Sequence, residues 1–409
     1  MEWLLYIIAF IAFVAFVSTI YIRIKYPFWS FMDANHSYDW FLRRPGKPIS
    51  IKPCRNKYVV RAQVKTATQS DSSDSSVAEP SSVAELVAQL LQRHLIPSDK
   101  ILYECEAKHI EARMTGHDAQ ASLYYDFDYP LITKPSGTIV SYPVHIMEPT
   151  EDKSSTNPST KFAVNYISHV AAAEDATIQK LIATHIYNVH DKNPYCPAFL
   201  LKKDVGRCAG LRPITTFSTN LYFIDKAPKT QTTPITLVQI YKDNWHQVVD
   251  AIASLKGFVV ALDIGAIQAR VKAGILFVYA LMYRGTMIAM YFIEDAHMLY
   301  EHVADHGGKT LRLVATVSLT TDEKPHPTTS SGSASFLYLG FLEALAKIIK
   351  QNADYKMLLV DGLGSNQMIC EKMIEDKQIM KLTTTTGAYY FVNWAYRKTW
   401  ESKDVFILV

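Results

Sequence analysis

The residues that could most directly do chemistry lie at the end of the sequence, where residues 405–409 read VFILV. This apolar run follows a polar turn at 401–404 and predicts a final β-strand that buries the terminus, together with the α-carboxylate of Val409. A carboxylate removed from water is costly unless it has partners or a chemical task. One such task is general base catalysis, in which the carboxylate accepts a proton from an attacking group. The simpler alternative is a final strand whose terminus just reaches water.

Metal chemistry has little support in the sequence. No H-x-x-x-H pattern joins His169, His185 and His190. The five cysteines are widely separated, odd in number and without a C-x-x-C pair, which argues against a disulfide framework or a structural zinc site and favours a reducing compartment. We therefore predict no metal site and no bound cofactor. The cysteines are Cys54, Cys105, Cys196, Cys208 and Cys370.

Length and charge set further limits. The chain has 409 residues, of which 49% are hydrophobic, so it can form two domains or one large fold with a sizeable core. Its net charge of +3 comes from Lys and Arg residues that are spread along the sequence. Because no basic block is interleaved with aromatic residues, we predict no nucleic-acid partner.

Alternating helical and extended patterns surround the candidate residues and predict a mixed α/β sheet. A capping-box pattern at 82–85 opens an amphipathic helix that runs to His94. The polar insertion 151–160 separates two strand-like runs and is expected to be the surface loop of a hairpin. Further strands are predicted at 199–201, 221–224, 257–260, 275–282, 286–292 and 388–396, and further helices at 177–188 and 238–255.

Four stretches resemble the N-myristoyltransferase family and occur in the family's order. GTIVSYPVHI at 137–146 is similar to the strand that carries the family's Ile-Ser-x-x-Pro, and FAVNYIS at 162–168 is similar to its Asn-Phe-Leu-Cys strand. Residues 341–373 resemble the family's last helix, its next strand and a Leu-x-x-Asn turn. YYFVNW at 389–394 and the terminal VFILV resemble the family's YYLYNW and its final strand.

The resemblance implies an α/β fold of two GNAT-like lobes, with the acyl-CoA side at 84–230 and the acceptor side at 231–409. It implies transfer of an acyl group from acyl-CoA, as co-substrate, to a peptide amine. The backbone N–H groups of Tyr166 and Ile167 would hold the thioester oxygen as negative charge develops on it. The carboxylate of Val409 would take the proton from the amine.

In the family, a basic, glycine-containing loop and a helix N-terminus hold the pyrophosphate of CoA. The resemblance places the corresponding contacts at Asn165, Ser168, Ala173, Ala176 and Thr177. The sequence departs from the family here, because 169–177 reads HVAAAEDAT, without Gly, Lys or Arg and with two acidic residues. Each acid would oppose a pyrophosphate by about 1 kcal/mol, although acids are also ordinary capping residues in a first helical turn.

Two functions therefore remain open. One is a membrane-anchored acyltransferase resembling N-myristoyltransferase. The other is a catalytically silent member of the same fold, kept as a membrane scaffold or virion protein, since a fold does not by itself imply an activity.

The first 25 residues are predicted to be a membrane anchor. Residues 3–22 carry no charge and are long enough as a helix to cross a hydrocarbon layer of about 30 Å. A cleaved signal peptide would need a basic region before the apolar run, and a buried core helix would show a polar stripe. Basic residues follow the span and none precedes it, which predicts a single-pass protein with a cytosolic large domain. These residues are Arg23, Lys25, Arg43, Arg44 and Lys47.

Two further segments connect the anchor to the folded part. Residues 26–65 are expected to form a juxtamembrane segment, and IKYPFW and HSYDWF in this region also resemble uncharacterised proteins of large DNA viruses. Residues 66–83 are predicted to be a low-complexity linker, because TATQSDSSDSS cannot bury enough apolar area to offset the entropy of ordering it.

Overall fold

The computed structural model describes residues 2–25, 46, 48–49, 56–62, 83–96, 100–115, 118–125, 135–149, 159–193, 196, 198–208, 210–229, 235–241, 244–303, 306–319, 330–376 and 379–409. The helices are α1 (Glu2–Lys25), α3 (Val83–His94), α4 (Ala107–Met114), α5 (Asp175–Lys192), α6 (Trp245–Ala253), α7 (Ile264–Lys272), α8 (Ser330–Gln351) and α9 (Asn366–Glu375). The strands are β1 (Val59–Ala62), β2 (Ile101–Tyr103), β3 (Gln120–Tyr125), β4 (Pro135–Pro149), β5 (Ser159–Ala172), β6 (Phe199–Lys203), β7 (Thr215–Phe223), β8 (Ile235–Gln239), β9 (Phe258–Ala261), β10 (Leu276–Tyr283), β11 (Thr286–Val303), β12 (His306–Ser318), β13 (Tyr355–Asp361), β14 (Met380–Val392) and β15 (Val405–Leu408).

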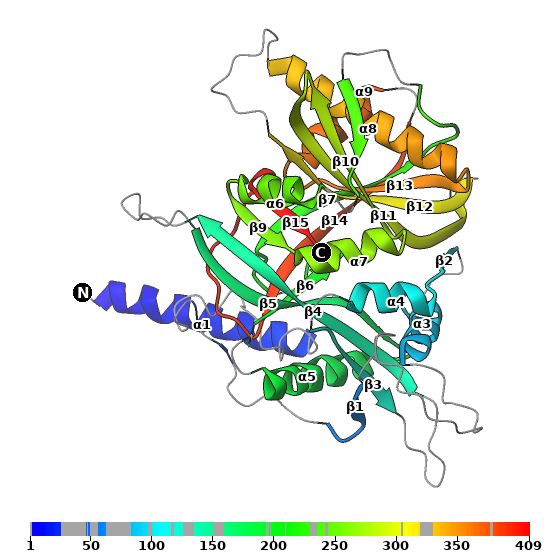
Figure 1. Ribbon diagram of the computed structural model, residues 1–409. Coiled ribbons are helices and arrows are strands. Elements are labelled where there is room, and N and C mark those ends of the chain that lie inside the picture. Colours follow the sequence, from blue (N-terminus) through cyan, green and yellow to red (C-terminus); the bar gives the residue numbers. More distant parts are fainter. Residues whose placement is uncertain are drawn as a thin grey trace, which may run out of the picture.

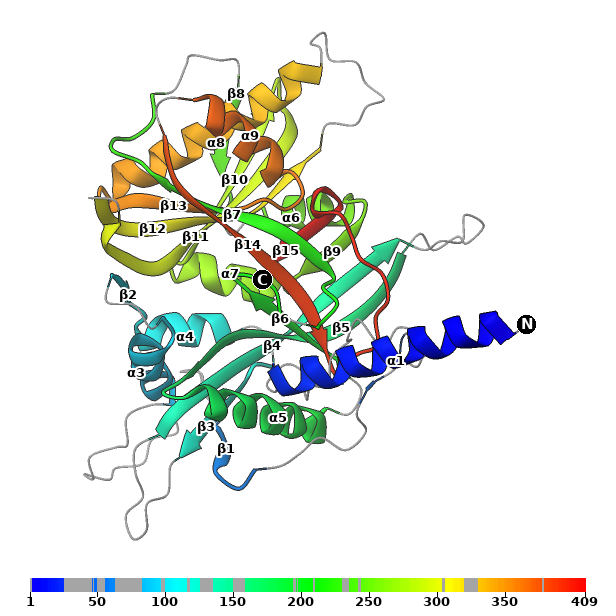
Figure 2. The same ribbon diagram turned by 180° about the vertical axis from the view of Figure 1, so that it is seen from behind.

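One twisted sheet of 15 strands runs through both halves of the molecule, which confirms the predicted mixed α/β class (Figure 1). The strand order is β1-β3-β4-β5-β6-β14-β7-β13-β12-β11-β10-β8, with β9 between β4 and β15, and β2 on β11. Three neighbouring pairs are parallel, namely β5–β6, β12–β13 and β9–β15, and the other pairs are antiparallel. Strands from the two halves of the sequence interleave at the centre, where β14 lies between β6 and β7 (Figure 2).

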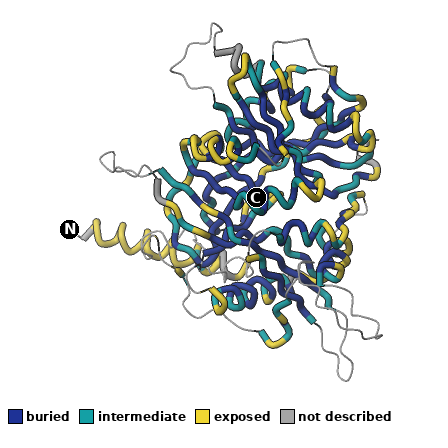
Figure 3. The backbone as a smooth tube through the Cα atoms, viewed as in Figure 1, coloured by how far each residue is buried: buried dark blue, intermediate teal, exposed yellow. Residues whose placement is uncertain are grey.

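Helices cover the sheet on both halves. In Figure 1, α3, α4 and α5 lie against the lower half, and α8 and α9 lie against the upper half. The strands behind them are the most deeply buried part of the chain (Figure 3). The central core includes Leu200, Phe258 and Phe292, none of which exposes any surface. Burying one such side chain contributes about 1.5–3 kcal/mol relative to leaving it in water.

Most predicted elements occur where the sequence pattern placed them, and one is wrong at its start. The segment 238–255 was predicted to be entirely helical, but Val238 belongs to β8 and pairs with Ala280 of β10. The helix α6 begins only at Trp245. A cross-strand partner far along the chain therefore overrides the local helical pattern at the beginning of this segment.

The hairpin between 137–146 and 162–168 is confirmed by the antiparallel pairing of β4 with β5. Of the loop predicted at 151–160, residues 151–158 lie outside the described residues, as does Ser82 of the capping box. The loop prediction is wrong at its end, because Ser159 and Thr160 belong to β5 and pair with Pro149 and Glu148. Strand β14 starts earlier than predicted and ends at Val392, one residue before Asn393, whose φ of 56° cannot continue an extended strand.

Helix α1 protrudes from the rest of the molecule (Figure 2). The segment Trp3–Tyr21 is long and apolar enough to cross a membrane, and none of it is buried in the structure. The absence of burial excludes a core helix of this chain, whereas an anchor and a signal sequence both remain compatible with it. The predicted juxtamembrane segment and linker lie almost entirely outside the described residues.

Candidate active site

The candidate site centres on an irregularity in the ladder between β4 and β5. Ser141 pairs with Ile167, but the next pair joins Val140 with His169, so Ser168 is an extra residue on β5. Such a bulge bends the strand and leaves the extra residue outside the ladder. The neighbouring strand β6 pairs with β5 only as far as Ile167. Strands β5 and β6 therefore separate at the bulge.

The two residues predicted to form an oxyanion hole lie immediately before this bulge. Tyr166 has partners on both neighbouring strands, Tyr142 on β4 and Leu200 on β6, and Ile167 is paired on both sides in the same way. Both side chains are buried. The residue outside the ladder is Ser168, so the bulge lies one position later than the two predicted residues.

A chain of hydrogen bonds links the bulge to the surface strand β2. The hydroxyl of Tyr103 lies 3.0 Å from Nε2 of His169, and Nδ1 of His169 lies 3.0 Å from Oγ of Ser168. Ser168 in turn donates to the carbonyl oxygen of Val140 at 3.3 Å. Because the Ser168 proton is used there, its oxygen must accept from His169 Nδ1–H, which leaves Nε2 to accept from Tyr103. Burial, reinforced by nearby arginines, holds the pKa of His169 well below its usual value, so the ring stays neutral.

The predicted CoA contacts fall into two groups. Asn165 and Ser168 belong to β5, where the buried amide of Asn165 donates to the carbonyl oxygen of Cys196 at 3.2 Å. Asn165 is therefore satisfied within the protein, and any contact it makes to a ligand would have to use other atoms.

The second group lies at the start of α5. The backbone N–H of Ala173 donates to Ser136, and that of Thr177 donates to the carbonyl oxygen of Glu174. Ala176 lies in the first turn, and Glu174 is the N-cap residue but makes no side-chain capping hydrogen bond. The acidic start seen in the sequence thus lies at the helix N-terminus, where the dipole favours negative charge.

The chain end lies at the middle of the molecule, between the two halves (Figures 1 and 2). The backbone N–H of Leu262 donates to the carbonyl oxygen of Leu408 at 3.1 Å, at the end of the parallel pair β9–β15. Val409 is half-buried and packs against the central core. Asp263 follows as the N-cap of α7, and its Oδ1 lies 2.7 Å from Nε2 of His145.

A buried charge network crosses the centre of the sheet. The carboxylate of Asp361 lies 2.9 Å from Nζ of Lys202 and 2.5 Å from Nη2 of Arg312, and it accepts a hydrogen bond from Thr219 at 2.7 Å. Lys202 also contacts Asp204. Burial alone would raise the pKa of Asp361, but Arg312 and Lys202 hold it well below its usual range. The network joins β6, β7, β12 and β13 through one ionised carboxylate.

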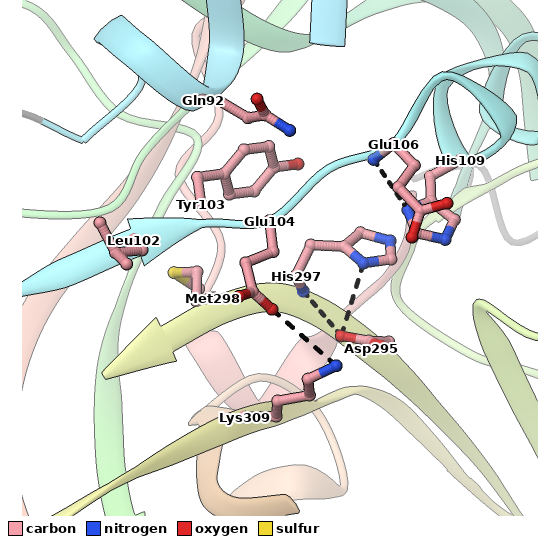
Figure 4. Close-up of a pocket in the computed structure, with 10 residues that line it drawn as sticks. All are labelled: Gln92, Leu102, Tyr103, Glu104, Glu106, His109, Asp295, His297, Met298 and Lys309. Atoms are coloured by element: carbon pink, nitrogen blue, oxygen red, sulfur yellow. Dashed lines mark hydrogen bonds and ion pairs between the residues drawn. The ribbon is translucent and has the colours of Figure 1, made fainter. Parts of the chain in front are cut away.

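A cavity of about 480 Å³ opens between β2, α4 and β11 (Figure 4). The polar groups around it include three carboxylates, two imidazoles and one lysine. Tyr103 lines it, so the cavity is connected to the bulge by the hydrogen bonds of Tyr103 and His169. The lining residues are Gln92, Leu102, Tyr103, Glu104, Glu106, His109, Asp295, His297, Met298 and Lys309.

His297 is turned into this cavity by a second bulge. In the ladder between β11 and β12, Asp295 pairs with Leu311 and the next pair joins Leu299 with Lys309, so three residues of β11 lie opposite one residue of β12. His297 is the middle one of these three residues and has a φ of 53°. This left-handed conformation is strained for a residue with a side chain. The backbone N–H of His297 donates to Asp295 at 2.8 Å, and its ring stacks on His109 with the centroids 4.1 Å apart.

The two imidazoles are neutral at ordinary pH. Burial lowers the pKa of both, and that of His297 to about 4. Nδ1 of His109 accepts from the backbone N–H of Glu106, so its proton is on Nε2. Nε2 of His297 is buried, without a hydrogen-bond partner among the described residues. At neutral pH the lining is therefore acidic, because three carboxylates face one lysine.

The sequence carried no signal for this cavity. His109 and His297 belong to different halves of the chain and are in no shared motif, and only the pairing of β2 with β11 brings them together. Among the described residues, no group of three His, Cys, Asp or Glu side chains is arranged to hold a metal ion.

Comparison with solved structures identifies the fold. The chain resembles crystal structures of Saccharomyces cerevisiae N-myristoyltransferase with bound myristoyl-CoA, with a TM-score of 0.64. In one, 11% of residues are identical and the match covers 92% of this chain and 94% of that chain; in another, the values are 10%, 95% and 95%. No protein-family model matches the sequence, and no curated protein matches it. At this identity the likeness shows the fold, which confirms the predicted N-myristoyltransferase-like architecture.

Proposed function

We propose that this protein is an N-acyltransferase that transfers an acyl group from acyl-CoA to an amine of a peptide. The observation that carries the proposal is the fold itself, which has a strand bulge, a central chain end and an acidic cavity within one sheet. The yeast protein of the same fold binds myristoyl-CoA. Helix α1 would hold the enzyme on a membrane as a single-pass anchor, with the large domain in the cytosol.

The reaction joins the amine nitrogen to the thioester carbon and breaks the carbon–sulfur bond. The electron pair of that bond leaves on the sulfur of CoA, which takes up a proton. The resemblance assigns stabilisation of the developing negative charge on the oxygen to the backbone N–H groups of Tyr166 and Ile167. Both residues are paired on both sides in the sheet, so the free N–H groups would come from the bulge that follows them, where β5 separates from β6. The carboxylate that Val409 carries at the end of this sequence would accept the proton lost by the amine.

The acidic cavity suits the acceptor. A peptide amine is cationic in water, and Glu104, Glu106 and Asp295 would attract it. The cavity lies next to Tyr103, whose hydrogen bonds lead to the bulge.

The binding of the acyl donor is the direct test. Full-length protein in detergent should unfold at a higher temperature with myristoyl-CoA or another long-chain acyl-CoA, because a ligand that binds only the folded state stabilises it by mass action. Release of the CoA thiol should then require a peptide with a free amine. Stabilisation by no member of an acyl-CoA series would reject the proposal.

A catalytically silent scaffold is the second candidate, and the acidic start of α5 favours it. Glu174 is at the N-cap and Asp175 begins the helix, where the family holds pyrophosphate. The double variant Glu174→Gln, Asp175→Asn removes both charges without changing side-chain size. If the wild type binds acyl-CoA weakly, this variant should bind it more tightly; if neither binds, the scaffold function is supported.

A further inference from the structure

Arg270, in the last turn of α7, is a guanidinium group almost completely removed from water, with 2% of the residue exposed. It lies over the ring of Tyr142, with Cζ 5.0 Å from the ring centroid. Its Nε and Nη2 are buried and have no hydrogen-bond partner among the residues that the structure describes. The stacking contact with Tyr142 does not replace those hydrogen bonds, because a ring face cannot accept from the edge of the guanidinium.

The surrounding charges do not balance. Arg113 of α4 and Glu294 of β11 are also buried, and Nη2 of Arg113 lies 2.5 Å from Oε1 of Glu294. These three buried side chains therefore carry two positive charges and one negative charge, and Glu294 contacts Arg113. Removing a charge from water without a partner is costly, so such a position is rarely kept without an anion to fill it.

The free edge of Arg270 has a specific shape. Nε and Nη2 lie on the same side of the planar guanidinium and direct two N–H bonds in parallel. Two oxygens of one carboxylate match this pair, which is the geometry of bidentate recognition. A single excess charge also matches a monocarboxylate better than a phosphate dianion.

His169 lies within the electrostatic influence of this cluster. Burial is the first cause that lowers the pKa of His169, and Arg113 and Arg270 lower it further. Tyr142, under Arg270, pairs with Tyr166 in the ladder, so the guanidinium lies beside the β4–β5 ladder.

We infer that Arg270 binds the carboxylate of a small organic acid through Nε and Nη2, beside Tyr142 and the β4–β5 ladder. This site goes beyond the proposed acyl transfer, which needs no carboxylate ligand. The neighbouring ion pair Arg113–Glu294 remains in contact when the acid binds.

The test uses full-length protein in detergent and three probes: sodium octanoate, acetate and inorganic phosphate. Octanoate should raise the unfolding temperature of the wild type. Arg270→Met replaces the charge with an apolar side chain, so without a probe it should be at least as stable as the wild type, but octanoate should no longer stabilise it. The matched variant Arg113→Met should be less stable, because it leaves Glu294 buried without its partner.

Arg270→Lys is the second variant, since it keeps the charge and loses the two-pronged edge. It should need at least tenfold more octanoate than the wild type for the same shift. The inference is overturned if no probe stabilises the wild type, or if Arg270→Met responds to octanoate as the wild type does. A response to phosphate alone would overturn the assignment of a carboxylate.

Discussion

The hydrogen bond from Leu262 N–H to the carbonyl oxygen of Leu408, 3.1 Å long, aligns the end of β15 with the residue that precedes the N-cap of α7. Val409 is therefore the first residue beyond this ladder, between a core strand and the first turn of a helix. Adding or removing a single residue at this end would therefore move the carboxylate away from this position.

Extension of the chain by one glycine tests the proposed base. The added residue moves the carboxylate by about 3.5 Å, beyond hydrogen-bond reach of a bound amine. We expect acyl transfer to fall at least a hundredfold while acyl-CoA binding and the circular dichroism spectrum are unchanged. An insertion of one glycine between Asp225 and Lys226, which are exposed, controls for chain length. Full activity of the extended protein would contradict a terminal base.

Asp361→Asn should destabilise the protein strongly. The change removes the buried carboxylate that Lys202 and Arg312 share and leaves Lys202 with Asp204 alone, which costs about 3 kcal/mol. Because the folded pKa of Asp361 lies below the unfolded value of about 3.9, its contribution is complete above that pH and is lost as pH falls below it. Urea unfolding between pH 7 and pH 3 should show a smaller acid loss in the variant. Asp225→Asn, at an exposed position, is the matched control variant.

His185 should make the free energy of unfolding depend on pH in a higher pH range than Asp361 does. Its ring is buried, hydrogen-bonded to Ser122 at 2.9 Å and Ser141 at 2.7 Å, and burial lowers its pKa to about 3. The unfolded chain takes up this proton near pH 6.5, so stability is complete above that pH and declines toward pH 4 by at most about 1.4 kcal/mol per pH unit for one group.

The variant His185→Gln isolates this contribution. At pH 7.5 it should be less stable by about 1 kcal/mol for the weakened hydrogen bonds, but its loss between pH 6.5 and pH 4 should be smaller than that of the wild type. His190→Gln, at a half-exposed position, is the matched control variant. An identical slope in wild type and His185→Gln would show that the ring titrates normally. His109, His169 and His297, whose pKa values burial also lowers, contribute to the remaining slope.

Gly340→Ala should destabilise the protein, although replacing glycine with alanine inside a helix usually stabilises a protein. Alanine is normally favoured over glycine inside a helix by about 1 kcal/mol. On α8, however, a Cβ at Gly340 would lie 2.5 Å from the hydroxyl oxygen of Tyr291 and 2.7 Å from Leu281. We expect a net loss of about 1–3 kcal/mol from overpacking, measured by urea unfolding. Tyr291→Phe removes the contacting oxygen, so a double-mutant cycle should show partial recovery; a stabilised Gly340→Ala protein would refute the close contact.

The N-terminal helix should place the protein in membranes in one orientation. The protein synthesised with microsomes should resist carbonate extraction, and removal of residues 2–25 should release it. Added protease should digest the large domain, because the basic residues follow the span. Protection of the large domain would reverse the orientation, and loss of 2–25 during synthesis would indicate a signal sequence.

Local patterns in the sequence were sufficient to predict much of the fold. The helix expected at 177–188 is α5, and the strands expected at 137–146 and 162–168 are β4 and β5, because apolar periodicity is a property of neighbouring residues. The order of the family-like stretches also predicted the architecture that the solved structures share at 10–11% identity. The sequence alone determined as well that the start of α5 is acidic.

Only the tertiary structure decided which charged groups have partners and which residues line the cavity. Whether Arg270 has a partner depends on which residues of α4, β4 and β11 surround it, and those residues are far from it in the chain. The stacking of His297 on His109 depends on a bulge in β11 and on a strand from the other half. Val238 belongs to a strand rather than a helix because it pairs with Ala280 of β10. Each outcome is a free-energy balance between distant groups, which a local pattern does not contain.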